Sequence, residues 1–341
     1  MNQKTVGRLA VCVALCFCAS MLFAGGTAES ASAVSSAASA LTGKVVVYCP
    51  SPAGLADKLA AGFEAKTGVK VEMFQGTTGQ ISARLEAEKA NPVADVVIVA
   101  SWPDGMSMRD LAMSYEPSNL DKMNPGWVDS ERKLFGTSAS AVGVIYNTTQ
   151  VPSLSADWNE LSDSRYKDMT CIPDPLLSGS CKDFITGFID AYGESGWDIL
   201  SGFAGNGMTV PGANKAALEA VTTGEKAILV AGVDYNAYSS KAKGEPLDIY
   251  YPASGTVINP RPAMILKTSR NVNNAKAFID YLLSDEAQQL VCDAYLLPGR
   301  TDIVTTKRTN VQDIPQVDSD WGWMMENSAA VMDRFSKLFM R

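Results

Sequence analysis

The chain has 341 residues, of which 46% are hydrophobic and 19% are charged, and its formal net charge is −8. This composition is that of an ordinary globular protein, and the length is that of two lobes or domains rather than one small core. The acidic balance argues against nucleic acid and anionic membrane surfaces as partners. The absence of histidine excludes Ser-His and Cys-His nucleophile systems and the common zinc hydrolases.

The first residues have the pattern of a secretory signal peptide. Lys4 and Arg8 precede an uncharged apolar run of about 15 residues, which is shorter than the ~20 that a membrane-spanning helix needs. We therefore predict a signal peptide over residues 1–28 and a periplasmic or extracytoplasmic location, with an uncleaved membrane anchor as the alternative. Because no later apolar run is longer, a multi-pass membrane protein is not expected. Cleavage would remove two of the 29 basic side chains and none of the 37 acidic ones, so the net charge would become −10.

The sequence leaves two questions about export open. "GTA" ending at Ala28 and "ASA" ending at Ala33 both have small residues where a signal peptidase cleaves. A lipid anchor requires a Leu-x-x-Cys box, and "LCFC" ending at Cys18 has the bulky Phe17 where a small residue is usual. Lipid anchoring is therefore an alternative to a freely diffusing exported protein.

Four of the seven cysteines would remain after cleavage: Cys49, Cys171, Cys181 and Cys292. Disulfides form in exported proteins, and Cys171 and Cys181 are close enough in sequence to pair, but the spacing alone does not decide between a bond and two thiols. We expect Cys49 and Cys292 to be buried free thiols. Without histidine or a Cys-x-x-Cys motif, a zinc site is not expected.

The predicted fold begins near Lys44, after a segment over residues 29–43 that is rich in Ala and Ser and contains no aromatic residue. Such a segment cannot bury enough apolar surface to order itself, so we predict a flexible linker. Beyond it, short apolar runs alternate with segments of helical periodicity. The predicted strands cover residues 44–49, 69–74, 94–100, 141–148, 168–175, 226–233 and 262–269. The predicted helices cover residues 52–68, 81–90, 181–196, 214–225, 271–295 (one helix or two) and 319–340.

This alternation predicts an α/β protein whose parallel strands have helices on both faces, so ligands should bind at the carboxyl ends of the strands. Three junctions there are rich in Gly, Ser and Thr: residues 49–54, 74–80 and 173–180. The free amides and the dipole at the start of a helix attract an anion, and small hydroxyl residues add donors. The alternative is that these residues only cap their helices.

Two of the junctions form candidate anion cradles. The first consists of Thr77, Thr78, Gly79 and Gln80, and the second of Ser178, Gly179 and Ser180. We also count Ser51 and Ser101 among the candidate ligand contacts.

The stretch "AGVDYNAYSS" places Asp234, Tyr235 and Tyr238 close together, as a metal-ligand cluster, a pocket wall or the end of a strand would. Enzyme signatures are otherwise missing. There is no Walker loop and no Gly-x-Gly-x-x-Gly after a strand, and Ser-x-x-Lys at 164–167 and 240–243 has no companion motif. We therefore do not expect an enzyme.

Several segments, in their order along residues 44–305, resemble the type 2 substrate-binding proteins of ABC importers. They are "AGFEAKTGVKVE", "GQISARLEAEKANPVADVVI", "GVIYNT", "NKAALEAVTTGEKAI" and "NNAKAFIDYLLSDEAQ". The chain is most similar to the branch that holds ferric-ion-binding proteins and their relatives for phosphonates and sugar phosphates.

The resemblance implies two α/β lobes, each a mostly parallel sheet flanked by helices, joined by two hinge strands around residues 141–147 and 250–257. The implied division is lobe 1 over 44–140, lobe 2 over 141–257, a return to lobe 1 over 258–305, and a C-terminal helical segment over 306–341.

The resemblance also implies a site. Ferric-ion-binding members use two adjacent tyrosines, a carboxylate and an anion at a helix N-terminus. Here the tyrosine pair falls on Asp234 and Tyr235, so one tyrosine is missing. The anion position falls on Ser178, Gly179 and Ser180, and a polar position falls on Asn214. Fe(III) would then depend on Tyr235, Asp234 and an acid such as Glu72.

In the organic-anion relatives both cradles would hold a phosphate or phosphonate, and Asp234 and Tyr235 would bond the rest of the ligand. The alternative is that Asp234 caps a helix and that Tyr235 and Tyr238 pack against the hinge. The predicted ligand contacts are Ser51, Thr77, Thr78, Gly79, Gln80, Ser101, Ser178, Gly179, Ser180, Asn214, Asp234 and Tyr235.

The predicted function is that of an extracytoplasmic solute-binding protein that captures a small anionic solute, an organic phosphate or phosphonate, and delivers it to an ABC permease and its ATPase. The alternative is a ferric iron-binding protein of an iron ABC transporter, and an exported enzyme or a sensor module on the same scaffold ranks below it. No resident cofactor is expected, since Fe(III) would be cargo, and we expect a monomer.

Overall fold

The computed structural model describes residues 41–340. The predicted signal peptide, its cleavage and lipidation points, and all but the last residues of the predicted linker lie outside these residues. None of the helices within residues 41–340 combines the length and the apolar character that crossing a membrane requires.

The strands form one mixed sheet with the order β2-β1-β3-β8-β4-β6-β5, in which β7 and β9 also pair with β4. Their bounds are β1 Lys44–Cys49, β2 Lys70–Gln75, β3 Val96–Ile98, β4 Phe135–Asn147, β5 Thr170–Cys171, β6 Ile228–Val233, β7 Leu247–Tyr250, β8 Ile258–Ile265 and β9 Leu297–Pro298.

The α-helices in this part of the chain are α1 Ala53–Thr67, α2 Thr78–Ala87, α3 Trp102–Ser107, α4 Gly179–Tyr192, α5 Glu194–Gly205, α6 Asn214–Thr222, α7 Asp234–Ala242, α8 Val272–Leu282, α9 Asp285–Asp293 and α10 Trp321–Phe339. Short 3-10 helices cover Arg109–Leu111, Leu120–Lys122, Pro125–Trp127, Asn159–Ser162, Ser164–Tyr166 and Val311–Asp313. The segment predicted as one helix or two over 271–295 is two, because Ser284 caps α9 by accepting a hydrogen bond from the amide of Ala287.

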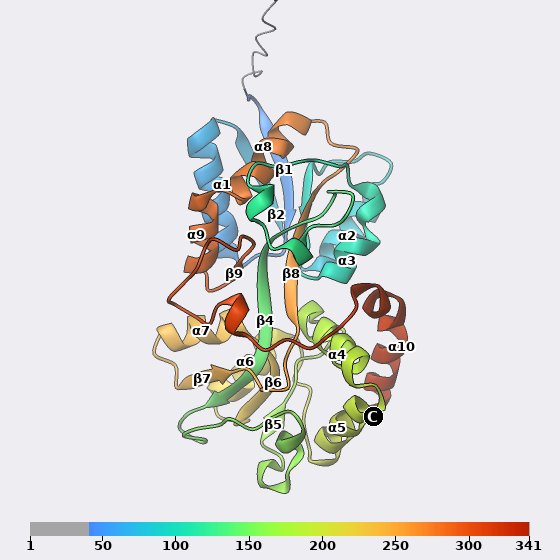
Figure 1. The fold of residues 1–341 in the computed structure, drawn as a ribbon, viewed down its shortest axis with the longest axis vertical. Helices are drawn as coiled ribbons and strands as arrows, with labels where there is room; N and C mark the ends of the chain where they lie inside the picture. Colours follow the sequence, from blue (N-terminus) through green and yellow to red (C-terminus); the bar gives the residue numbers. More distant parts are fainter. Residues whose placement is uncertain (1–40, 341) are drawn as a thin grey trace, which may run out of the picture. The chain divides into compact units, whose positions relative to one another are not determined.

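The helices cover the two halves of the sheet separately, which gives two lobes (Figure 1). In the first lobe, α1, α8 and α9 pack on one face of β1, β2, β3 and β8, and α2 and α3 pack on the other. In the second lobe, α4, α5 and α10 pack on one side of β4 and β6, and α6 and α7 pack on the other. This mixed α/β architecture agrees with the predicted fold class.

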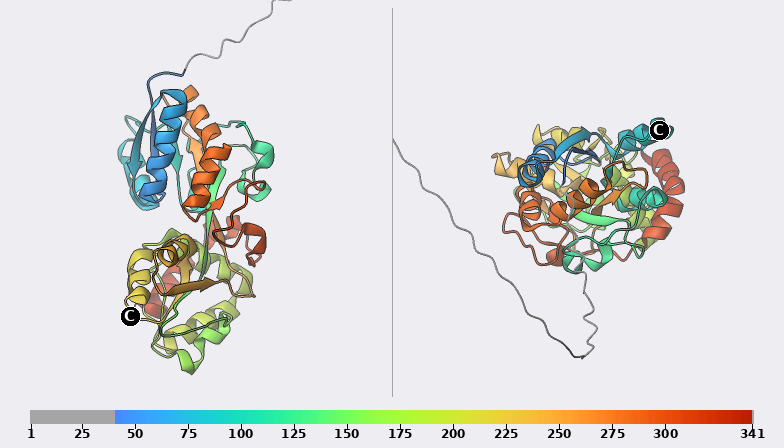
Figure 2. Two further views of the ribbon diagram at one scale, coloured as in Figure 1. Left: turned by 90° about the vertical axis from the view of Figure 1, so that its left-hand side faces the viewer. Right: turned by 90° about the horizontal axis from the view of Figure 1, so that it is seen from above.

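The strand β4 belongs to both lobes, and all of its 13 residues are buried. Its first part pairs with β8, and residues 142–147 pair with β6 and β7. Figures 1 and 2 show β4 and β8 running between the lobes. Because the chain crosses in opposite directions along these two strands, their pairing is antiparallel, and only β1–β2, β1–β3 and β5–β6 among the described strand pairs are parallel. In the first lobe β2, β1 and β3 are parallel, as predicted, whereas in the second lobe β4 pairs antiparallel with β6 and β7. The second crossing strand is β8, which starts just after the predicted range 250–257.

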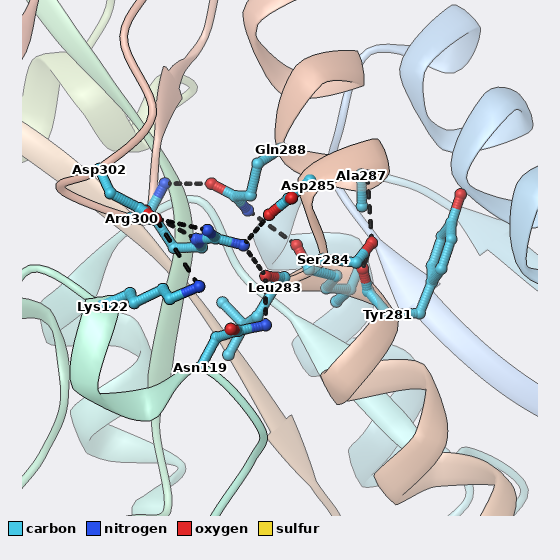
Figure 3. A network of polar contacts seen from close by, with 12 residues as sticks. Asn119, Lys122, Tyr281, Leu283, Ser284, Asp285, Ala287, Gln288, Arg300 and Asp302 are labelled. Atoms are coloured by element: carbon cyan, nitrogen blue, oxygen red, sulfur yellow. Dashed lines mark hydrogen bonds and ion pairs between the residues drawn. The ribbon is translucent and has the colours of Figure 1, made fainter.

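A polar network holds the turn after α9, where the chain leaves the first lobe for the last time (Figure 3). Arg300 is 3% exposed and pairs with Asp285 and Asp302, each at 2.6 Å. The side-chain carbonyl of Gln288 accepts a hydrogen bond from the amide of Gly299 at 2.8 Å. From this anchored turn, the chain returns to the second lobe and ends in α10, which packs against α4 and also against α3 of the first lobe.

The cysteines in the described chain, Cys49, Cys171, Cys181 and Cys292, are all buried free thiols. The sequence left open whether Cys171 and Cys181 form a disulfide or remain thiols, and in the structure both are thiols. The thiol of Cys181 donates to the carbonyl of Pro173 at 3.2 Å, and burial raises its pKa well above the ordinary value.

Candidate ligand-binding site

A cavity of about 650 Å³ lies between the two lobes. The segments that line it follow β1 and β3, begin α2, α4, α6 and α7, or belong to β4 and β8. The structure therefore places this cavity where the carboxyl ends of strands meet helix N-termini. It brings together most of the residues predicted as ligand contacts: Thr77, Thr78, Gly79, Ser178, Gly179, Ser180, Asn214 and Tyr235.

The first predicted cradle is a capping box at the start of α2. The hydroxyl of Thr77 accepts a hydrogen bond from the amide of Gln80 at 3.2 Å, and the side chain of Gln80 accepts one from the amide of Thr77 at 2.8 Å. Thr78 accepts from the amide of Ala100 at 3.1 Å, which joins α2 to the end of β3. Gln80 is used as a cap and does not line the cavity, whereas Thr77, Thr78 and Gly79 do.

The second predicted cradle begins α4 and is built from three side chains that bond one another. Ser178 caps the helix by accepting from the amide of Cys181 at 3.2 Å, and it donates to the side-chain carbonyl of Asn214 at 2.8 Å. The amide group of Asn214 donates to the hydroxyl of Ser180 at 3.3 Å. Since α4 has 14 residues, its first free amides also carry the positive end of a helix dipole toward the cavity.

Two cations that sequence reasoning missed also line the cavity, Arg261 on β8 and Lys182 in the first turn of α4. Arg261 is 3% exposed; its Nη2 donates to the carbonyl of Pro50 at 3.0 Å, and its Nε has no partner among residues 41–340. Lys182 pairs with Asp104 at 2.8 Å. Burial acts to lower the pKa of Lys182, but the carboxylates of Asp104 and Asp183 outweigh it and raise the pKa above its usual value, so the ammonium stays charged.

One feature of the sequence could have indicated the role of Arg261: it is the single charged residue in the run "INPRPAMI". The predicted strand began one residue later, at Pro262, and so left the arginine in a loop. Lys182 carried no local sign of its role, because its partner Asp104 comes from the other lobe.

Three more predicted contacts do not line the cavity as expected. Ser51 is half-buried, and its amide donates to the sulfur of Cys49. Ser101 is fully buried as the N-cap of α3 and bonds Asp183. Glu72, the acid considered for iron, pairs with Lys44 at 2.8 Å near the opposite end of β1.

Asp234 is the largest correction to the predicted site. It is the first residue of α7, its side chain is fully buried, and its carboxylate forms an ion pair with the equally buried Arg308. The same carboxylate accepts from the amide of Ala141 at 2.8 Å and from the hydroxyl of Tyr251 at 3.2 Å. Its charge is therefore neutralised inside the protein, and it does not face the cavity as a ligand contact or a metal ligand.

The two tyrosines that follow Asp234 in the chain differ in whether they line the cavity. Tyr235 lines the cavity, whereas Tyr238 lies within hydrogen-bond distance of the hydroxyl of Thr309, at 3.2 Å, and under the guanidinium of Arg308. No group of three or more His, Cys, Asp or Glu side chains within residues 41–340 is placed to hold a metal ion. The cavity lining has one phenol and one carboxylate, Asp104, beside the two cations.

The comparisons with known proteins agree with this architecture. Residues 91–320 match the family model of bacterial extracellular solute-binding proteins. The chain is 30% identical over 292 residues to an uncharacterized protein of Haemophilus influenzae, and the aligned region covers 79% of each chain.

Among solved structures, the fold is similar to that of iron-bound HitA from Pseudomonas aeruginosa, with a TM-score of 0.76, 21% identity, and 86% of this chain and 99% of that chain covered. It is also similar to the periplasmic binding protein AfuA from Actinobacillus pleuropneumoniae with fructose 6-phosphate bound, with a TM-score of 0.76, 23% identity, and 87% and 99% covered. These likenesses confirm the type 2 periplasmic-binding fold, and the family is one of transport binding proteins rather than enzymes. The chain therefore belongs to the bacterial extracellular solute-binding proteins, the binding components of ABC transporters.

Proposed function

We propose that this protein captures a small organic phosphate or phosphonate in the cavity between its lobes and delivers it to the permease of an ABC importer. The observation that carries the proposal is Arg261, a buried guanidinium that lines the cavity while its Nε has no partner in the described chain. A buried charge that is only partly hydrogen-bonded is costly, and an anion in the cavity would offset the positive charge of the guanidinium.

The surroundings of Arg261 support the same ligand class. Lys182 adds a second positive charge, and the N-termini of α2 and α4 add free amides. Hydroxyl groups of Thr77, Thr78 and Ser180 surround the same space. A phosphoryl group has three oxygens, and each accepts several hydrogen bonds. The amides, hydroxyls and cations of this wall would supply the donors.

Ferric iron is the second candidate, because a solved structure of the same fold, HitA, is iron-bound. Here Tyr235 and Asp104 are the oxygen ligands that the cavity offers, and Asp104 is already paired with Lys182. Two cations beside a trivalent ion repel it unless anions bind with it. The donor set therefore favours an anion over bare Fe(III).

The experiment is a thermal-shift and calorimetry screen of the purified chain against 2-aminoethylphosphonate, glucose 6-phosphate, inorganic phosphate and Fe(III)-citrate. A ligand at 100 times its Kd adds about 2.7 kcal/mol to the free energy of unfolding. We expect a phosphoryl compound to stabilise the protein. Arg261→Gln should weaken its binding by at least about 30-fold, since loss of one partner of a buried charged contact costs ~2 kcal/mol or more.

The control is Lys66→Gln, which removes an exposed cation from the same lobe and should leave the affinity unchanged. Stabilisation by Fe(III) alone, with a phenolate charge-transfer colour that Tyr235→Phe abolishes, would replace the phosphoryl proposal by the iron one.

A further inference from the structure

Two polar contacts join the lobes beside the cavity. The hydroxyl of Ser101, at the start of α3 in the first lobe, donates to Asp183 on α4 of the second lobe at 3.0 Å. Next to it, Lys182 on α4 pairs with Asp104 on α3 at 2.8 Å. We call these four residues the latch. Both contacts join α3 to α4, and Asp104 and Lys182 also line the cavity.

Asp183 is an unusual group to find in such a contact. It is 1% exposed, and its second carboxylate oxygen, Oδ2, has no hydrogen-bond partner in the described chain. Within residues 41–340 there are five such buried side-chain atoms without a partner, and four of them belong to Asp183, Asn259 and Arg261. Among the described residues, the buried side-chain atoms without a partner are therefore concentrated at the junction between the lobes.

The geometry of α4 and β8 explains why these residues gather there. Asn259 and Arg261 are two residues apart on β8 and face the same side, as does Ser140, which is paired with Asn259 and lines the cavity. Helix α4 packs closely on this side, because a Cβ at Gly187 would lie only 2.8 Å from Val257. Asp183 is one turn before Gly187 on the same face of α4, which places it toward this polar stretch of β8.

We propose that Asp183 is a positioning residue that holds the lobes together when it carries a proton and releases them when it is ionised, so that the latch is linked to pH. The proposal concerns the protein without solute and does not depend on which solute it binds.

The groups around Asp183 determine whether a rise in pH strengthens or weakens the latch. Burial raises the pKa of Asp183 to about 7, and Asp104 from α3 adds to that rise, while Lys182 on its own helix and the hydroxyl of Ser101 act the other way. The positive charge of Lys182 is already shared with Asp104, and Arg261 from β8 bonds the carbonyl of Pro50. Cys181 on the same helix stays a neutral thiol, because its pKa is raised well above the usual value.

In a released state, Asp183 would face water, with a pKa near the ~3.9 of an ordinary aspartate. The latched state then binds one more proton than the released state between about pH 4 and pH 7. The latching equilibrium constant should therefore fall as the pH rises through this window, by up to about tenfold per pH unit, and should level off above it.

The test measures the distance between the lobes in the solute-free full-length protein from pH 4.5 to 8.5. Spin labels at Lys89→Cys and Lys243→Cys report on opposite lobes. Cys12, Cys16 and Cys18 are replaced by serine, and the cysteines of the described chain are buried and will not compete. We expect the short-distance population to fall as the pH rises and to level off above about pH 8. In Asp183→Asn, which is neutral at every pH, this population should stay high throughout.

Asp198→Asn removes an exposed carboxylate from the same lobe and should keep the pH response of the parent protein. If Asp183→Asn does not fold, Asp104→Asn serves instead. It leaves Lys182 facing Asp183 alone and should move the response to lower pH. A parent protein whose lobe distance does not change with pH, an unchanged response in Asp183→Asn, or an unmoved response in Asp104→Asn would each overturn the proposal.

Discussion

Asp234 and Arg308 form the most completely buried ion pair described in this chain, with both side chains at 0% exposure. Arg308 also donates to the carbonyl of Tyr295 at 2.7 Å and to the hydroxyl of Tyr251 at 3.0 Å. The pair thus ties α7 to the segment that returns from the first lobe after α9. Breaking such a pair leaves one charge buried without its partner, which is far more costly than losing both charges together.

We predict that Arg308→Met lowers the free energy of unfolding by about 3–5 kcal/mol, because the carboxyl group of Asp234 would be left in the interior without its partner. The double variant Asp234→Leu, Arg308→Met should lose clearly less than Arg308→Met alone. Urea denaturation measures both. The matched control is Arg334→Met, which removes the arginine of an exposed pair with Glu194 and should change stability little. A loss in Arg308→Met no larger than in this control would contradict the role given to the pair.

At the scale of the elements, a helix cap that lines the cavity should contribute both to stability and to solute binding, whereas a cap elsewhere should contribute to stability alone. Ser178 and Ser284 cap α4 and α9 by the same type of hydrogen bond, but only Ser178 lines the cavity. We predict that Ser178→Ala and Ser284→Ala each lower the free energy of unfolding by about 1 kcal/mol. Only Ser178→Ala should also weaken solute binding, measured by calorimetry with the phosphoryl compound found in the screen. Equal affinities in the two variants would show that the second cradle is only a cap.

The last helix offers a test of how far the C-terminal segment belongs to the fold. Phe335 of α10 is fully buried in the core of the second lobe. We predict that Phe335→Ala lowers the free energy of unfolding by about 3–5 kcal/mol, since it leaves a cavity that its neighbours cannot fill. The exposed neighbour Lys337→Ala serves as the control. If chemical denaturation shows no difference between the two variants, α10 contributes little to the core.

The elements also show which parts of the site a sequence can reveal. The two cradles could be predicted because Gly, Ser and Thr at a strand-to-helix junction carry their chemistry locally. The roles of Lys182 and Asp234 could not, because their partners Asp104 and Arg308 are 78 and 74 residues away along the chain. Of the missed helices, α3 and α7 are short, with six and nine residues, so their periodicity was too brief to recognise. The 12-residue α5 was missed because its first residues were included in the helix predicted over 181–196. The extent of β4 was missed because its first half, "FGTSAS", is small and polar although it is buried.

At the scale of the whole molecule, the predicted monomeric state stays a prediction. The large apolar side chains exposed in the described chain are mostly scattered, apart from Leu176 and Leu177, which lie at the cavity, and Val93 and Leu111, which line a second, smaller pocket of the first lobe. The net negative charge also opposes self-association. Sedimentation equilibrium should therefore give the mass of one chain, and a stable dimer would contradict this expectation.

The route of the chain through the two lobes has a consequence for how the protein acquires its structure during export. The first lobe cannot close its sheet until β8 is available, because β8 lies between β3 and β4. The core of the second lobe includes Val331, Met332 and Phe335 of α10, which follows the other helices and strands of this lobe in the chain. Neither lobe can therefore complete its core while the chain is still being threaded out from its N-terminus. The order of the elements along the chain therefore delays completion of both cores until β8 and α10 are available.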